Sequence, residues 1–504
     1  MNKKNILFSL CIGTFTFLNA QTYVGEIQFL NRFEYVKLSC KDGVCEFSVP
    51  YVDGDKKFPV SGNPIDVINT RWEVDRGIED WKFTTELKDN KIRGKLYTTS
   101  GIQNITLTEQ LEGISKNILN HYNGVYQDED GLNLIIYDRF DFLHIISPYS
   151  EETMSLKPIG ENRFWSISGE KSTFKDFSKN TYNTIEVTNR KGLKKILKRT
   201  LGYKVQEKWI PIKKDTLYAK LYMPISDKKV PACLVLPGGG ATGIDNYEFE
   251  AMLFAANGMA SLVFDKSGNG KSKGPGNFQL QSFEEKNIQY IQLFNYLKKH
   301  PQVNSNKVGV HGPSEGGRLS LLMAIDLKDQ ISFVNAIAAP LMTMKEGQFY
   351  AMDQHHRLLG ISEIENMDIQ GIWSIYYQGI IDGKIDEDII GQISNYSKKN
   401  NRLFLPPPST VIPSSPTKED LLNERVVNEA NQITCPVFLQ YGENDQRVNA
   451  TKSLMNFYPR ITNKDLIQTK FYPRASHSLM TPEFKISPGY LQDKIKWLKK
   501  IHIL

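Results

Sequence analysis

The hydrophobic positions divide the chain into two parts with different periods. From residue 23 to about 199, short segments alternate between apolar and polar residues, and turn-forming runs such as 88–91 and 128–131 separate them. Clear examples of the alternation lie at 36–40, 81–84 and 95–98. Period-two alternation broken by turns is typical of antiparallel β structure, a sandwich or a barrel. Residues 21–200 are therefore predicted to form a β-rich accessory domain, and they contain no convincing internal repeat.

The second part follows a basic connector at 190–199 and has longer apolar runs. Two segments around Lys213, Lys214 and Asp215 predict a hairpin. Helical patterns then alternate with apolar strand-like runs, which lie at 230–236, 260–264, 308–310, 333–338, 437–441 and 466–472. Ser282 and Glu285 form a capping box that opens one of these helices. Nearly continuous apolar strands with helices between them predict an α/β fold with a doubly wound, mostly parallel sheet over residues 201–504.

One segment interrupts this alternation. Residues 341–430 contain helical patterns rich in aromatic residues and methionine, followed by a proline-rich run that begins at Leu405. The segment is too long for a plain connection, since about 5 residues is usual between two elements. It is predicted to be a helical cap or lid inserted into the α/β domain, and caps often shape a substrate pocket.

The N-terminus has the regions of a secretory signal peptide. Lysines at positions 3 and 4 precede the apolar run 6–18, and Asn19 and Ala20 follow it. Cleavage after Ala20 would make residues 1–20 the signal peptide and would place the protein outside the cell, in the periplasm or in the cell envelope. A membrane anchor is the alternative, but the run is short for a span of about 20 residues. No later stretch is long and apolar enough to cross a membrane, so no stable membrane span is expected after signal removal.

Charge and cysteine content narrow the class of protein. The formal net charge is only +6, and the lysines are scattered rather than gathered into a stripe, which disfavours nucleic acid as a partner. Cys40 and Cys45 flank an Asp-Gly hairpin signal and could face each other as a disulfide in an oxidising compartment. Cys233 and Cys435 lie in or beside apolar runs and are expected to be buried. No spacing of cysteine and histidine resembles a zinc site, and no metal or cofactor is predicted.

The strongest chemical signal is a Gly-x-Ser-x-Gly pattern formed by Gly312, Ser314 and Gly316. A short apolar strand precedes it and a helical pattern follows it, which is the context of a nucleophile elbow. Bulky side chains at the two glycines would collide with neighbouring segments. A second match around Ser272 lacks that context, because Gly274, Pro275 and Gly276 cannot continue into a helix. Ser272 is therefore interpreted as a loop residue.

A nucleophilic serine needs a base and a carboxylate that orients the base. Asp445 and His477 each follow an apolar strand, and the chain order Ser, Asp, His is that of α/β-hydrolases. Because strand ends converge at one edge of a parallel sheet, these residues are expected to meet there. Glu443 is an alternative acid. His311, on the strand that leads to the serine, is expected to be packed, and the adjacent His355 and His356 to point to different sides of a helix.

An oxyanion formed during acyl transfer needs two fixed N–H donors. The glycine-rich run 236–243 follows the first parallel strand, where bare backbone can approach a substrate. We assign the donors to the amides of Glu315, directly after the serine, and Gly239, with Gly240 as a second possibility.

These features carry a family resemblance. From about residue 205 to the end, the chain resembles the α/β-hydrolase superfamily, in the group of secreted esterases and prolyl-oligopeptidase-like serine peptidases. The matching segments are 236–240, 264–274, 312–317, 441–448 and 475–477. The resemblance implies that Ser314 is the nucleophile, Asp445 the acid and His477 the base. The family often has Asp-x-Arg-Gly-x-Gly-x-Ser after the second strand, and this chain carries Ser267 in place of that arginine.

The first functional hypothesis is a secreted serine esterase that forms an acyl-enzyme with a small-molecule ester. A serine peptidase with the same triad is the second, although the β-rich part lacks the repeat of about 40 to 50 residues that a propeller would show. A non-catalytic binding protein on a hydrolase scaffold is the third. The β-rich part itself has two interpretations, a substrate or glycan binding module, or an accessory that narrows access to the catalytic domain.

Overall fold

The computed structural model describes residues 21–29, 32–49, 56–66, 70–77, 80–99, 101–109, 116–139, 142–149, 152–160, 162–166, 170–189, 192–482 and 486–504. The predicted signal peptide at residues 1–20 lies outside them. The chain divides into two compact units, Met1–Gly113 and Ile114–Leu504.

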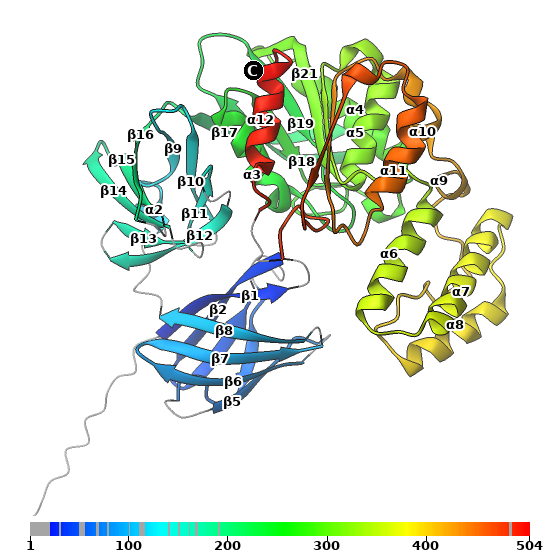
Figure 1. Cartoon of the computed structure of the whole chain (residues 1–504), viewed down its shortest axis with the longest axis horizontal. Coiled ribbons are helices and arrows are strands. Elements are labelled where there is room, and N and C mark those ends of the chain that lie inside the picture. Colours follow the sequence, from blue (N-terminus) through cyan, green and yellow to red (C-terminus); the bar gives the residue numbers. More distant parts are fainter. Residues whose placement is uncertain are drawn as a thin grey trace, which may run out of the picture. The chain divides into compact units, whose positions relative to one another are not determined.

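The first unit contains an antiparallel barrel (Figure 1). Its strands follow one another around the barrel in sequence order, and β1 pairs with β8 to close it. The core includes Trp72 and Phe83, whose rings stack with centroids 3.7 Å apart. The strands are β1 (Gln21–Phe29), β2 (Arg32–Lys41), β3 (Val44–Ser48), β4 (Phe58–Ser61), β5 (Thr70–Asp75), β6 (Asp80–Lys88), β7 (Lys91–Thr98) and β8 (Gly101–Glu109).

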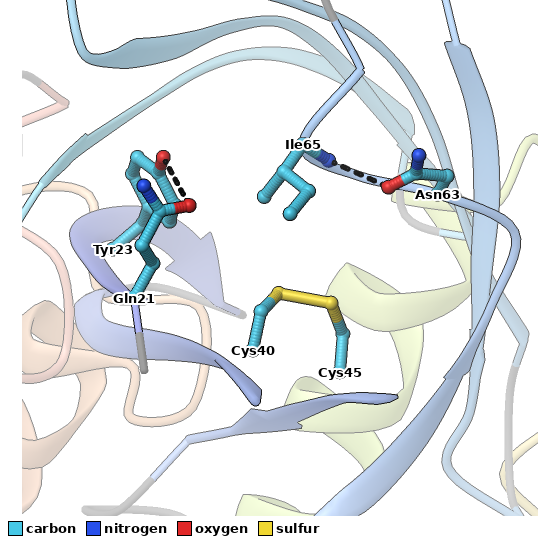
Figure 2. Close-up of a disulfide and its surroundings, with 6 residues drawn as sticks. All are labelled: Gln21, Tyr23, Cys40, Cys45, Asn63 and Ile65. Atoms are coloured by element: carbon cyan, nitrogen blue, oxygen red, sulfur yellow. Dashed lines mark hydrogen bonds between the residues drawn. A yellow bond between two sulfur atoms is a disulfide. The ribbon is translucent and has the colours of Figure 1, made fainter. Parts of the chain in front are cut away.

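The hairpin of β2 and β3 carries a disulfide. Cys40 and Cys45 lie opposite each other across the two strands, and their Sγ atoms are bonded (Figure 2). Asp42 and Gly43 form the turn with φ of 51° and 79°, the left-handed conformation that two-residue hairpin loops need. The pairing that the Asp-Gly signal suggested is therefore present. Cys233 and Cys435 are free and buried, as predicted.

The second unit begins with α2 (Lys116–Leu119) and another closed antiparallel barrel, in which β9 pairs with β16. Its core includes Tyr122, Phe164 and Phe174, with the rings edge to face. The strands are β9 (Gly124–Gln127), β10 (Asn133–Arg139), β11 (Phe142–Ser147), β12 (Glu152–Gly160), β13 (Arg163–Trp165), β14 (Lys171–Ser178), β15 (Thr181–Thr188) and β16 (Lys194–Arg199).

The prediction of antiparallel β structure in this part of the chain is confirmed. The sequence indicated one accessory domain over residues 21–200, whereas the structure forms two barrels in different units. The difference has a physical reason: closing each ring pairs strands that are far apart in the sequence, and local alternation carries no information about that pairing.

The rest of the second unit is an α/β sheet in the order β17-β18-β20-β19-β21-β22-β23-β24. The hairpin of β17 and β18 is antiparallel to β20, and the pairs from β20 to β24 are parallel. The strands are β17 (Tyr203–Ile212), β18 (Asp215–Pro224), β19 (Val230–Val235), β20 (Ala260–Phe264), β21 (Val303–Pro313), β22 (Val334–Ile337), β23 (Val437–Gly442) and β24 (Ile467–Tyr472). The predicted hairpin and apolar strands are all present.

Helices cover both faces of this sheet (Figure 1). Along β19, Leu234 joins a core with α4 and α5, whereas its neighbours Cys233 and Val235 join a core with α3 and α12. This alternation explains why the strand is apolar on both sides. The helices are α3 (Ile244–Ala256), α4 (Phe283–Lys298), α5 (Glu315–Leu327), α11 (Ala450–Phe457) and α12 (Tyr490–Lys500), with short 3-10 turns at Phe278–Leu280, Lys328–Gln330, Ala430–Gln432, Tyr458–Arg460 and Lys464–Leu466.

The second barrel packs on the face that α3 and α12 cover. Val125 and Ile135 belong to the same apolar core as Phe254 of α3. Polar contacts join the two parts as well, since Asn133 Nδ2 donates to the Ala256 carbonyl oxygen at 2.8 Å. The barrel is thus continuous with the sheet through a shared core rather than through a linker alone.

Helices fill the segment between β22 and β23. They are α6 (Met344–Leu358), α7 (Glu363–Asp382), α8 (Glu387–Lys399), α9 (Lys418–Leu422) and α10 (Arg425–Asn428). The insertion has its own core, which includes Trp373, Tyr376 and Tyr377. As predicted for adjacent helical residues, His356 is buried against Asn366 while the His355 ring reaches the Arg402 carbonyl at the surface. Within the described part of the chain, no helix combines the length and the apolar character that a membrane crossing requires.

Candidate active site

Ser314 lies at the turn from β21 into α5. Its backbone has φ 55° and ψ −120°, a conformation that side-chain-bearing residues rarely adopt. The turn is held by its own hydrogen bonds, because the Ser314 amide donates to the Ile337 carbonyl at 2.7 Å and the Arg318 amide donates to the Ser314 carbonyl at 3.1 Å. This strained strand-to-helix turn has the geometry of a nucleophile elbow, which exposes the serine Oγ at the end of the strand.

The glycines of the elbow are required by close backbone contacts. A Cβ at Gly312 would lie 2.5 Å from the carbonyl carbon and oxygen of Gly316. A Cβ at Gly316 would lie 2.7 Å from the Pro237 carbonyl oxygen. The collisions expected from the sequence pattern are therefore present, and both involve backbone, which cannot move aside as a flexible side chain can.

This contact leads to a stability prediction. Gly316→Ala is expected to lower the free energy of unfolding by about 1–3 kcal/mol, the usual cost of overpacking a tight site, and to shift the glycine-rich loop 236–243, which contains Pro237. Gly391→Ala is the matched control, because Gly391 is exposed in α8 and a methyl group added there would have no other atom within 4 Å. That control should be neutral or slightly stabilising. Urea unfolding followed by intrinsic fluorescence measures both, and equal midpoints would contradict the close-contact argument.

Asp445 and His477 meet at the same edge of the sheet. Asp445 follows β23 and His477 follows β24, and the His477 Nδ1 lies 2.8 Å from the Asp445 Oδ2. The other carboxylate oxygen, Oδ1, accepts the amides of Arg447 and Val448 at 2.8 and 2.9 Å. The Asp445 carboxylate is thus immobilised, with one oxygen left for the imidazole. A proton on Nδ1 donated to Asp445 leaves Nε2 as the basic nitrogen.

The elbow serine lies at the end of β21, two strands from β23 in the sheet order. Among the hydrogen bonds of the described residues, none joins the Ser314 Oγ to His477, and such contacts are often long before a substrate is bound. The structure therefore brings Asp445 and His477 into contact and places Ser314 on the same strand-end edge.

The alternative residues have other partners. Glu443 is exposed, and its Oε2 accepts the Arg474 amide at 3.3 Å. His311 is fully buried, with Nδ1 2.9 Å from the Asn335 Oδ1. Ser272 donates its hydroxyl to the Asp265 carbonyl at 2.7 Å and accepts the Tyr218 amide at 3.0 Å, so it stabilises a loop, as the sequence indicated.

The glycine-rich loop after β19 lies beside the elbow. A Cβ at Gly239 would lie 3.8 Å from the Glu315 Cβ, so these two residues are neighbours. Glu315 is the first residue of α5, where amides have no acceptor within the helix. The Gly238 amide already has a hydrogen-bond acceptor, since it donates to the Tyr247 hydroxyl at 2.9 Å. Gly240, the second possible donor, has φ 71° and lies one residue further along the loop.

Sequence reasoning missed the lysines near this loop. Lys266, two residues after the end of β20, is buried and donates to the Gly238 carbonyl at 2.8 Å. Lys286 of α4 donates to both carboxylate oxygens of Glu315 at 3.0 and 3.1 Å. Ser267 stands where the resembled family has an arginine, and this difference could have pointed to Lys266, a cationic side chain one position earlier. Ser267 itself is buried and donates to the Gln289 Oε1 at 3.1 Å.

The helical insertion contacts the candidate site at two points. The Tyr350 hydroxyl of α6 donates to the Asp445 carbonyl at 2.8 Å. Arg318 of α5 forms a buried ion pair with Glu424 at 3.0 Å and also donates to the Met342 carbonyl at 2.7 Å. Burial raises the pKa of Glu424 to about 7, although Arg318 opposes that shift. Both ends of the insertion are therefore anchored to elements that carry site residues.

Among the residues that the structure describes, no group of three or more histidine, cysteine or acidic side chains is arranged to hold a metal ion.

A mostly parallel sheet with this strand order, an elbow serine after β21 and an Asp-His pair after β23 and β24 are features of the α/β-hydrolase fold. The second unit therefore has the fold of the α/β-hydrolases. Residues 287–381, which include Ser314, match the family described as BAAT / Acyl-CoA thioester hydrolase C terminal.

The curated relatives of the chain include an esterase and thioesterases. Esterase FrsA of Vibrio parahaemolyticus is 24% identical over 193 residues, which are 36% of this chain and 45% of that protein. Acyl-coenzyme A thioesterase 3 of Mus musculus is 31% identical over 121 residues, which are 24% of this chain and 26% of that protein. The chain therefore spans less than half the length of these relatives.

Similar solved structures include Est1E from Butyrivibrio proteoclasticus with bound ferulic acid, at 17% identity and a TM-score of 0.38, over 59% of this chain and 98% of that one. Proline iminopeptidase of Mycobacterium smegmatis is similar at 15% identity and a TM-score of 0.39, again over 59% and 98% of the two chains.

Proposed function

We propose that the protein is a serine hydrolase that cleaves a carboxylic ester through Ser314, His477 and Asp445. The observation that carries this proposal is the combination of a strained serine at the β21–α5 turn with an Asp445–His477 pair 2.8 Å apart at the neighbouring strand ends. Each residue type supplies what acyl transfer needs: a nucleophile, a base and an orienting carboxylate.

In the proposed mechanism, the His477 Nε2 takes the Ser314 hydroxyl proton as Oγ attacks the ester carbonyl carbon. The carbonyl oxygen becomes an oxyanion, and the amides of Glu315 and Gly239 donate to it. His477 then gives its proton to the leaving alcohol as the bond between carbonyl carbon and alcohol oxygen breaks. Water, activated by the same imidazole, attacks the acyl-enzyme and releases the acid and Ser314.

The acyl donor has two candidate chemistries. The esterase named among the relatives supports an oxygen ester. The family match and the thioesterases among the relatives support a thioester as the second candidate. Both share the acyl-enzyme route, and they differ in the leaving group, an alcohol or a thiol.

The helical insertion and the barrels have proposed roles as well. We propose that residues 341–430 are the cap of the site, because Tyr350 donates to the backbone of Asp445 and Arg318 pairs with Glu424. The second barrel shares a core with α3 and is proposed as an accessory to the catalytic domain.

We also propose that the protein works outside the cytoplasm. The residues of the predicted signal peptide support export, and the disulfide between Cys40 and Cys45 suits an oxidising compartment. A small molecule is the proposed substrate, with no role for nucleic acid.

Fluorophosphonate labelling tests the proposed function. Purified wild type is expected to label at Ser314, as read by mass spectrometry of the labelled peptide, and to hydrolyse short acyl esters faster than blocked or unblocked peptide amides. A short acyl-CoA series on the same enzyme compares thioesters with esters. Absence of labelling would leave a non-catalytic scaffold as the better hypothesis, and faster amide turnover would favour the peptidase.

A further inference from the structure

The glycine-rich loop at 236–243 is contacted by a buried lysine from the loop after β20, Lys266, and this contact has a consequence for the amide of Gly239. In a planar trans peptide unit, the C=O and the N–H point in opposite directions. The oxygen of Gly238 and the N–H of Gly239 belong to one such unit. Whatever fixes the direction of the Gly238 oxygen therefore also fixes the direction of the Gly239 N–H.

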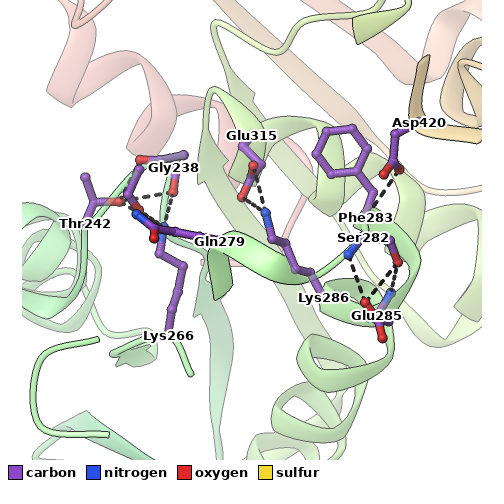
Figure 3. A network of polar contacts seen from close by, with 12 residues as sticks. Gly238, Thr242, Lys266, Gln279, Ser282, Phe283, Glu285, Lys286, Glu315 and Asp420 are labelled. Atoms are coloured by element: carbon purple, nitrogen blue, oxygen red, sulfur yellow. Dashed lines mark hydrogen bonds and ion pairs between the residues drawn. The ribbon is translucent and has the colours of Figure 1, made fainter. Parts of the chain in front are cut away.

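Lys266 fixes that oxygen (Figure 3). Its Nζ donates to the Gly238 carbonyl at 2.8 Å, to the Gly240 carbonyl in a short contact, and to the Thr242 hydroxyl at 3.4 Å. The side chain is only 1% exposed. A single ammonium thus bridges two carbonyls and one hydroxyl of the glycine-rich loop, one for each of its three N–H groups.

Other contacts hold the lysine and the loop in place. The Phe278 ring centroid lies 4.3 Å from the Lys266 Nζ, a distance at which the ring face stabilises a cation. The Thr242 hydroxyl lies 3.0 Å from the Gly238 carbonyl oxygen and 3.2 Å from the Gly239 carbonyl oxygen. These carbonyls therefore face the Lys266 and Thr242 side of the loop, and the following amides face the opposite side.

We propose that Lys266 is a positioning residue of the oxyanion hole, which holds the Gly238–Gly239 peptide unit with its N–H directed toward the reacting carbonyl oxygen. This inference rests on the proposed function and deepens it. Without the lysine, glycine residues would leave the loop free to rotate its peptide planes, since they lack a Cβ to restrict them. A hydrogen bond to the carbonyl also polarises the peptide unit and strengthens its N–H as a donor.

Burial and the charges around Lys266 set the pH at which its ammonium group loses a proton. Burial lowers the pKa of Lys266 to about 8, while Glu315 acts to raise it and Lys286 acts to lower it. Below that pH the ammonium donates three hydrogen bonds, and above it the neutral amine has only two N–H groups and no charge. Oxyanion stabilisation is thus expected to be complete well below pH 8 and to weaken as the pH rises through that value.

The test compares Lys266→Met, Lys266→Arg and Lys271→Met with wild type in ester hydrolysis. Lys271 is the matched control, because it is exposed in the same loop and its Nζ lies over the Tyr218 ring, 4.7 Å from the centroid. Lys266→Met is expected to lower kcat by about 10- to 100-fold. This loss is smaller than that caused by removing an oxyanion donor, because the Gly239 amide is misdirected rather than absent. KM should change by less than about 3-fold, and binding of a trifluoromethyl ketone should weaken by the same factor as kcat/KM. Lys271→Met should match wild type.

The pH profile distinguishes positioning from a purely structural role. Wild-type kcat/KM should fall above about pH 8, whereas Lys266→Arg should lack that decrease because arginine stays charged. If Lys266→Met does not fold, the pH profiles of wild type and Lys266→Arg test the inference on their own. Identical decreases of kcat/KM at alkaline pH in the two proteins would overturn it. If wild type labels with fluorophosphonate and hydrolyses ester, an unchanged kcat in a folded Lys266→Met variant would also overturn the inference. A wild type that neither labels nor hydrolyses would instead overturn the proposed function and this inference together.

Discussion

Replacing Ser314 with alanine is expected to lower kcat for a carboxylic ester by about 10⁵- to 10⁶-fold, the loss that removal of a triad nucleophile causes. The physical reason is that acyl transfer then has no covalent route, and only the oxyanion donors and substrate binding remain. The measurement is steady-state hydrolysis of a short acyl ester, together with fluorophosphonate labelling, which should disappear.

Alanine should not damage the fold, since the Ser314 amide and carbonyl make the turn hydrogen bonds and the Oγ makes none within the described residues. The matched control is Ser272→Ala, the serine of the second Gly-x-Ser-x-Gly pattern, whose hydroxyl contacts the Asp265 carbonyl and the Tyr218 amide. That variant should retain stoichiometric labelling. Labelling that persists in Ser314→Ala and vanishes in Ser272→Ala would assign the nucleophile to the other serine.

Asp445→Asn is expected to give the second largest loss, about 10³- to 10⁴-fold in kcat. The Asp445 Oδ1 accepts two loop amides and Oδ2 faces the His477 Nδ1. An asparagine has one oxygen, and the two loop amides would hold it, which leaves its NH₂ group facing the imidazole. The ring would then need a lone pair at Nδ1 and a proton at Nε2, so it could no longer accept the Ser314 proton.

Kinetic measurement of Asp445→Asn should show the loss in kcat with a smaller change in KM, and circular dichroism should show a retained fold. Glu443→Gln is the matched control, because the same chemical change falls on an exposed acid two residues away that faces the Arg474 amide. It should alter kcat by less than about 3-fold. A larger loss in Glu443→Gln than in Asp445→Asn would make Glu443 the orienting acid.

Much of the α/β domain could be predicted because its signals are local. Each apolar run from 230 to 472 formed a strand, and the Ser282 capping box opens α4 with both of its reciprocal hydrogen bonds. The elbow was recognisable because a strand, a serine between glycines and a helix follow each other directly. Asp445 and His477 were recognisable because each follows an apolar strand and the carboxyl ends of parallel strands lie at the same edge of the sheet.

Other features depend on contacts that no local pattern encodes. The division of the β-rich part into two closed barrels follows from the pairing of β1 with β8 and of β9 with β16. The contact between Tyr350 and the Asp445 carbonyl joins residues 95 positions apart. Such long-range contacts arise from packing and not from the order of neighbouring residues.

The amino-acid sequence by itself determined the class of fold, the strand that carries Ser314 and the loops that carry Asp445 and His477. This was possible because hydrophobic periodicity, helix capping and turn formation depend on residues that are close together in the sequence. Only the tertiary structure decided that Lys266 reaches back to Gly238 and Gly240, since a buried ammonium needs several carbonyl partners and these come from a different loop. The same holds for the 2.8 Å contact of Asp445 with His477, which exists because β23 and β24 pair in parallel.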